Sequence, residues 1–297
     1  MRKVEELTLG ERLKEYEFSY EKVVDSEKHI VIRIDGHKFS KYTIGFKKPF
    51  DDILSCAMIE TSKALLKEFK ASIVYTQSDE ITLIVPSYQD QTEDNRKTKS
   101  DKKRNKVSKR ISKKYDHNLG GRVQKLCSLT ASFTTMVFNR TLRQLVLKAE
   151  EEMYQTDYEK SKEMYFETLK EKFDMAWFDS RVFAVCEKEE LFNALLWRVR
   201  DAEKNSKSMA AYTYLPHKDL LGLTGEQRVE MLKERKGIDW NKYPDKFKYG
   251  IFMKKRLYEK EIEGDEQTCF RTTIEDFSEK MTFSQKNVEM VYKKYLD

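Results

Sequence analysis

The chain has 297 residues, of which 39% are hydrophobic and 12% aromatic, so it is long and apolar enough to bury a sizeable core. This composition excludes wholesale disorder, while 36% charged residues indicate a largely solvated surface. The net charge of +6 is compatible with a polyanionic partner but does not establish one.

The four cysteines, at positions 56, 127, 186 and 269, are scattered and form no CxxC pair. This spacing predicts neither a disulfide framework nor a zinc cluster, and it fits a reducing compartment. The charged N-terminus lacks the apolar core of a signal peptide, and no apolar run is long enough to span a membrane. We therefore expect a soluble, cytoplasmic protein.

The first half of the chain is predicted to alternate strands and helices. A charged helical lead-in over residues 1–28 precedes a buried strand over 29–36, which is rich in β-branched residues and ends at Gly36. Further elements follow, namely a helix over 50–69, a hairpin of strands over 72–77 and 81–86, a helix over 119–138, a charged helical stretch over about 140–176 and a strand over 181–186. The order β-α-β-β-α-β is that of the split-βαβ, or ferredoxin-like, fold.

The second half adds helices and one β pair. The predicted elements are helices over 188–214 and 225–237, strands over 250–262 and 269–277, and a C-terminal helix near Ser284, whose hydroxyl can cap it. The predicted fold class is therefore α+β. A ferredoxin-like domain over 29–186 would carry a helical and β extension over 187–297 packed on it.

Residues 88–118 interrupt this pattern with a segment that is rich in lysine and arginine and has almost no large apolar residues. Two interpretations are open. Blocks of like charge are commonly solvated insertions without a function. Alternatively, the segment is a basic arm that contacts phosphates, because each lysine near a nucleic-acid backbone releases counterions.

Two acidic sites are predicted to meet at one end of the sheet. Asp35 ends the first strand, and Asp79 and Glu80 lie at the tip of the hairpin. In the ferredoxin-like order the first and third strands are antiparallel neighbours, so Asp35 is expected within reach of both. Two carboxylates at so short a distance either take up a proton or bind a cation between them. Hard oxygen ligands suit Mg²⁺, and such a site is typical of two-metal catalysis. Each site alone is an ordinary turn, but their joint placement favours catalysis.

The loop after Asp35 is a candidate phosphate site. Gly36 allows a tight turn that presents backbone N–H groups, and Lys48 can add a cation to the same triphosphate. Phe39 either stacks on a base or fills the core. His37 is equally compatible with an ordinary polar loop.

Arg122 and Lys125 lie on the predicted opening turns of the helix over 119–138, where cations and a helix N-terminus favour an anion such as an RNA phosphate. The alternative is a solvated helical face. Asp179 and Arg181 are expected to pair with each other and are left out of the catalytic set.

The residues resemble a known family. RIDGHKFSKYT, FKKPFD, QSDE, GRVQKLCSLTASF and FDSRVF occur in this order, followed by WRVRDAEKNSKSMAA and NKYPDKFKYG. This series, from about residue 8 to about residue 250, is similar to that of the tRNA-His guanylyltransferase family.

The resemblance implies a polymerase-palm domain that extends RNA in the reverse, 3′–5′ direction. A tRNA 5′ end is activated with ATP or carries a triphosphate, and the 3′-hydroxyl of an incoming nucleotide such as GTP attacks it. Asp35 and Asp79 would bind two Mg²⁺ ions with the carbonyl of Gly36, and Glu80 would support catalysis. The residues that match nucleotide contacts of the family, besides Gly36, are His37, Lys38, Phe39, Ser40, Lys48, Asp51 and Ser78. Members usually form tetramers.

The chain departs from the eukaryotic pattern after the WRxxD segment. Eukaryotic members carry His-Ile-Asn-Asn there, whereas this chain has Glu203-Lys204-Asn205-Ser206. This resembles the bacterial, archaeal and viral branch of guanylyltransferase-like proteins, which repair truncated tRNA 5′ ends by templated addition. Asn205 still matches an asparagine of the motif and is expected to contact nucleotide or tRNA. Residues 251–297 carry no resemblance.

Two other functions remain open. A palm domain with the same carboxylates can serve a nucleotide cyclase or a 5′–3′ polymerase, since the metal chemistry is shared. The chain can also be a basic RNA-binding protein with a vestigial site, although the presence of Asp35, Asp79 and Glu80 together argues against this.

Overall fold

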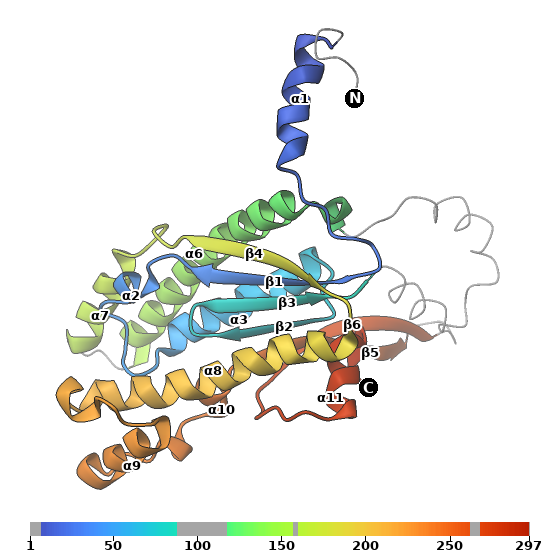
Figure 1. The fold of residues 1–297 in the computed structure, drawn as a ribbon. Helices are drawn as coiled ribbons and strands as arrows, with labels where there is room; N and C mark the ends of the chain where they lie inside the picture. Colours follow the sequence, from blue (N-terminus) through green and yellow to red (C-terminus); the bar gives the residue numbers. More distant parts are fainter. Residues whose placement is uncertain (1–6, 88–117, 157–159, 262–267, 297) are drawn as a thin grey trace.

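The computed structural model describes residues 7–87, 118–156, 160–261 and 268–296. Its centre is a seven-stranded sheet in the order β4-β1-β3-β2-β5-β6, with β7 paired to β5 (Figure 1). The strands are β1 (His29–Gly36), β2 (Ile73–Gln77), β3 (Glu80–Val85), β4 (Phe178–Val185), β5 (Ile251–Glu261), β6 (Thr268–Phe277) and β7 (Tyr295–Leu296). None of the helices among these residues is long and apolar enough to cross a membrane.

The four strands of the first half form the antiparallel array β4-β1-β3-β2, which confirms the predicted split-βαβ order and the α+β class. The late β pair extends this sheet, because β5 pairs with β2 through the register Val74↔Met253. The predicted boundary at residues 186 and 187 therefore divides elements of one continuous sheet.

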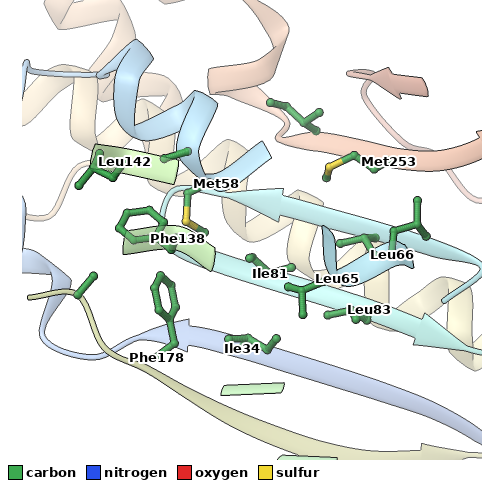
Figure 2. Packing of buried hydrophobic residues seen from close by; sticks show 14 of the residues in the cluster. Ile34, Met58, Leu65, Leu66, Ile81, Leu83, Phe138, Leu142, Phe178 and Met253 are labelled. Carbon is green, nitrogen blue, oxygen red and sulfur yellow. The ribbon is translucent and has the colours of Figure 1, made fainter. Parts of the chain in front are cut away.

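One face of the sheet is covered by α3 (Asp52–Glu68) and α6 (Val123–Thr156), with α7 (Lys160–Lys170) packed on α6. Every second side chain of β1 points into this core, and Figure 2 shows Ile34 beside Ile81 of β3 and Phe178 of β4. Leu65 of α3 is fully buried there. Each such aliphatic side chain contributes roughly 1.5–3 kcal/mol by leaving water.

The opposite face is covered by α8 (Lys188–Tyr214) and α11 (Gln285–Tyr292), while α9 (Gly225–Lys236) and α10 (Asp245–Lys248) pack on α8. The alternate side chains of the strands, such as Val31 and Tyr75, join this second core with Leu195 of α8. Two further α-helices of the described residues are α1 (Leu9–Ser19), which projects from the body in Figure 1, and the short α2 (Phe39–Tyr42).

Several predicted bounds are confirmed, and others are wrong for identifiable reasons. The helix over 188–214 is α8, and the Ser284 hydroxyl caps α11 by accepting from the Asn287 N–H. The helix predicted from residue 119 begins only at Val123, because Leu119 and Gly120 have left-handed backbones at φ 58° and 65°. It then continues into the charged stretch as far as Thr156.

The basic segment over 88–118 lies almost wholly outside the described residues, so both interpretations of it stay predictions. Within the described part of the lead-in, residues 7–28, the helix is α1, which begins at a capping box between Thr8 and Glu11. No residue of α1 is buried in the described chain.

Candidate active site

Asp35 and the hairpin turn meet as the split-βαβ order predicts. Asp35 pairs across the sheet with Glu80 of β3, and the Gly36 N–H donates to the Asp79 carbonyl at 3.1 Å. The turn is fixed by Ser78, whose backbone is left-handed at φ 54°, and by the Thr76 hydroxyl, which donates to the Glu80 carbonyl at 2.8 Å. The carboxylates of Asp35 and Asp79 are thus held at the same end of the neighbouring strands β1 and β3.

The protonation of Asp79 reflects this crowding. Burial, and next the charge of Asp35, raise the pKa of Asp79 to about 6, against hydrogen bonds from its own backbone and Ser78 that lower it. Among the described residues no group of three His, Cys, Asp or Glu side chains could hold a metal ion. Two crowded carboxylates and a backbone carbonyl still fit Mg²⁺, which usually takes one or two carboxylates together with substrate phosphates.

Glu80 lies beside this pair and is bound by Arg198 of α8. Its carboxylate accepts two hydrogen bonds from Arg198, from Nε at 2.5 Å and from Nη2 at 2.6 Å. The third nitrogen of Arg198 donates to Asp201 at 2.8 Å. Glu80 therefore links the hairpin to α8. Sequence reasoning missed Arg198, although it lies in the WRxxD segment, because no local pattern relates it to Glu80.

A cavity of about 500 Å³ opens between the carboxylates and α8. Its lining joins Asp35 and the 77–80 turn to Arg33, Tyr75, Arg198, Ala202, Asn205 and Met209. The structure therefore places Asn205 of α8 on the wall of the cavity that the carboxylates also line. It also adds Arg33, which sequence reasoning did not select.

The loop after Asp35 divides into exposed and buried parts. His37, Lys38 and Ser40 are exposed, and the His37 N–H donates to the Trp177 carbonyl at 2.8 Å. Phe39 is buried, with its ring 5.0 Å from that of Phe178, as the core interpretation predicts. A Cβ on residue 36 would lie 2.3 Å from the Phe39 ring, which explains the glycine there.

Asp51 has a structural role at the start of α3. It is 4% exposed, and its carboxylate accepts from the N–H groups of Leu54 and Lys47 at 2.9 Å and from the Tyr165 hydroxyl at 2.5 Å. Burial and this hydrogen bond raise the pKa of Tyr165. A smaller cavity of about 90 Å³ beside Ser78 is lined by Asp51, Lys48 and other polar and apolar side chains.

Arg122 and Lys125 lie away from both cavities. Arg122 precedes the helix rather than opening it, and its Nε donates to the Leu119 carbonyl at 3.3 Å and lies 3.6 Å from Glu21. Lys125 is exposed on the first turn of α6. The expected pair of Asp179 and Arg181 is present at 3.6 Å.

The fold and the site define an α+β protein with a carboxylate centre at the end of an antiparallel sheet. The model of the tRNA-His guanylyltransferase family matches residues 10–186. The chain belongs to this family of nucleotidyltransferases.

Solved structures and a viral sequence support this assignment. A bacterial tRNA-His guanylyltransferase-like protein in complex with ATP is 32% identical, with 83% of this chain and 88% of that one covered and a TM-score of 0.62. A bacterial protein of the same description in complex with GTP is 27% identical, with 90% of each chain covered and a TM-score of 0.59. An uncharacterised protein of Acanthamoeba polyphaga mimivirus is 28% identical over 97% of this chain and 90% of its own length.

A plant relative is more distant. The tRNA(His) guanylyltransferase 1 of Arabidopsis thaliana is 25% identical over 80% of this chain, which spans 35% of the length of that protein.

Proposed function

We propose that this chain is a Mg²⁺-dependent nucleotidyltransferase that adds guanosine, or template-matched nucleotides, to the 5′ end of a tRNA. The observation that carries the proposal is the pair Asp35 and Asp79, held together by the Gly36–Asp79 hydrogen bond, with the pKa of Asp79 raised to about 6. In the reaction, the 3′-hydroxyl of an incoming nucleotide attacks the activated 5′ phosphorus, and the bond to AMP or pyrophosphate breaks. Growth of the RNA is therefore in the 3′–5′ direction.

Asp35, Asp79 and the carbonyl of Gly36 are the proposed ligands of two Mg²⁺ ions. Bound there, the ions would supply activation of the attacking hydroxyl and neutralisation of the leaving group. The contribution of Glu80 is indirect, since its carboxylate is engaged by Arg198. Glu80 supports the site by holding α8 and Asn205 over the carboxylates.

GTP and ATP are the proposed nucleotide substrates. The exposed side chains of His37, Lys38 and Ser40, with the backbone at Gly36 and Phe39, would surround the triphosphate. Lys48 and Ser78 line the smaller cavity beside it, where a base can enter. Asp51 would act through its cap on α3, because its carboxylate already accepts three hydrogen bonds.

The RNA contacts are proposed at Asn205, on the cavity wall, and at Arg122 and Lys125, which would meet the tRNA away from the reacting end. We further propose a cytoplasmic homotetramer. Support for assembly comes from α1, which exposes Leu13 and Tyr16 and buries no residue within the described chain.

The test is incubation of the protein with labelled tRNA, Mg²⁺, ATP and GTP. One substrate is tRNA-His lacking its extra 5′ guanosine, and the other is a non-His tRNA lacking its first nucleotide. Extension of the first alone indicates a dedicated guanylyltransferase, and templated extension of the second indicates a repair polymerase. A longer 3′ end or a cyclic nucleotide, without 5′ extension, would overturn the proposal.

A further inference from the structure

The α8-facing side of the sheet carries two rows of charge at its β4 edge. Asp179, Asp35 and Glu80 lie side by side on β4, β1 and β3. Two residues along the strands, Arg181 of β4 is the register partner of Arg33 of β1. Register partners point their side chains to the same face of a sheet. A pair of arginines therefore borders the acidic row that includes Asp35.

The fold alone does not account for this arginine pair. Like charges directly opposite each other on neighbouring strands destabilise a sheet. Among the residues that the structure describes, Arg181 forms one ion pair, the 3.6 Å contact with Asp179. Both side chains are about half exposed, and such surface pairs contribute little. Arg33 forms no ion pair within the described part of the chain. An anion shared by the two guanidiniums would offset their repulsion.

An exposed indole adjoins Arg33 and a third arginine, Arg198 of α8. Trp197 of α8 is 49% exposed, and the guanidinium carbons of Arg33 and Arg198 lie 5.4 Å and 4.6 Å from its ring centre. Both arginines also line the cavity that holds Asp35 and Asp79. The ring is thus held at the rim of the active site while much of its surface faces solvent.

We propose that Arg33, Arg181 and Trp197 form a contact site for an RNA strand, in which the guanidiniums hold a backbone phosphate and the indole stacks on a base. Planar guanidiniums suit phosphates, and aromatic rings at a basic groove stack on the bases of single-stranded nucleic acid. A free nucleotide offers the same chemistry. The observations favour a polymer because Arg181 is 56% exposed on the edge strand and lies outside the cavity lining. The identity of the RNA as tRNA rests on the proposed function.

The test measures the affinity of a fluorescently labelled tRNA transcript by anisotropy, from about 50 to about 200 mM salt, with Ca²⁺ in place of Mg²⁺ to prevent turnover. Loss of one phosphate contact in Arg181→Gln should weaken binding and lower the slope of log affinity against log salt by about 1. Trp197→Ala should weaken binding by about 5- to 100-fold with the slope unchanged, and Trp197→Phe should keep most of the affinity.

Arg271→Gln is the matched control, since Arg271 is an exposed arginine on β6, the opposite edge of the same sheet. It should leave affinity and slope unchanged, and thermal melts would verify that each variant is folded. The proposal is overturned if Arg181→Gln behaves like Arg271→Gln, or if Trp197→Ala raises the KM for GTP without changing RNA affinity. The binding assay needs no turnover, so it can succeed even if the protein never extends a tRNA. If the expected affinity changes are found but no 5′ extension is detected, the proposed function is overturned and the RNA contact site stands.

Discussion

The two faces of β1 carry different tasks, although they alternate along the same eight residues. Ile30, Ile32 and Ile34 are at most 1% exposed beneath α3 and α6. On the other face Val31 is buried, while Arg33 and Asp35 reach the cavity under α8. One face therefore stabilises the strand, and the end of the other presents chemistry from a position that the first has fixed.

This contrast explains how a crowded acidic pair can persist. Asp79 is unfavourable where it stands, because burial and Asp35 raise its pKa to about 6. Its position is maintained by the apolar face and by backbone hydrogen bonds, including the one from the Gly36 N–H to the Asp79 carbonyl, while its carboxylate is destabilised by burial and by Asp35. Substitutions on the two faces should therefore have opposite signatures, one in activity and the other in stability.

The largest effect on activity is expected from Asp79→Asn. Loss of a proposed metal ligand should lower 5′ nucleotide addition by more than about 100-fold, since even outer-shell partners of metal sites are worth 10–100-fold. The melting temperature should not fall, because the substitution removes a desolvated charge. Initial rates at saturating Mg²⁺ measure the first effect, and a thermal melt measures the second. Near-native turnover would contradict the ligand assignment.

Leu65→Ala is the counterpart on the apolar face. Leu65 is fully buried in α3, so its truncation should lower the free energy of unfolding by about 2–5 kcal/mol through lost burial and the cavity left behind. At a temperature where the variant is folded, kcat should be unchanged. Urea denaturation and initial rates on one preparation separate the two quantities. A large loss of kcat in the folded variant would argue against the division between the faces.

Much of this division could be predicted from the sequence. The β-branched run of β1 and the helical periodicity of α3 predicted correct elements because each pattern is local. The approach of Asp35 to Asp79 followed from strand order alone. The N-cap role of Asp51 was also accessible, since it immediately precedes α3 in the chain.

The contacts made by α8 were beyond prediction. Arg198 and Glu80 are 118 residues apart, and their pairing depends on how α8 lies across the sheet. The opposition of Arg33 and Arg181 depends on the register between β1 and β4, which a shift of one residue would abolish. The expected pair of Asp179 and Arg181 is present, but Asp179 also belongs to the acidic row and Arg181 to the arginine pair.

The pH dependence of stability should also report the crowded pair. In EDTA, Asp79 is protonated in both states below about pH 4, whereas between about pH 4 and 6 the unfolded chain ionises it first. Because the folded-state pKa is raised, the free energy of unfolding falls as pH rises through this window. The total decrease is about 3 kcal/mol and is complete above about pH 6. Asp79→Asn should lack this decrease. Urea midpoints of both proteins across the window, compared pairwise, test the sign, and parallel curves would contradict it.

The smallest of these effects concerns the link between the hairpin and α8. Arg198→Met leaves the Glu80 carboxylate, whose side chain is 15% exposed, without its two charged hydrogen bonds. The expected loss is about 2–3 kcal/mol of stability, together with a reduced kcat because α8 and Asn205 lose their anchor. The double variant Glu80→Met with Arg198→Met removes the unpaired charge of Glu80, so it should recover most of the stability.

A charge exchange tests how Glu80 contributes to activity. If Glu80 acts only by its ion pair with Arg198, exchanging the pair as Glu80→Arg with Arg198→Glu should recover part of the activity lost in either single variant. If the exchanged protein is folded but recovers no activity, the reaction needs the carboxylate at position 80 itself. That result would indicate that Glu80 contacts the reacting groups.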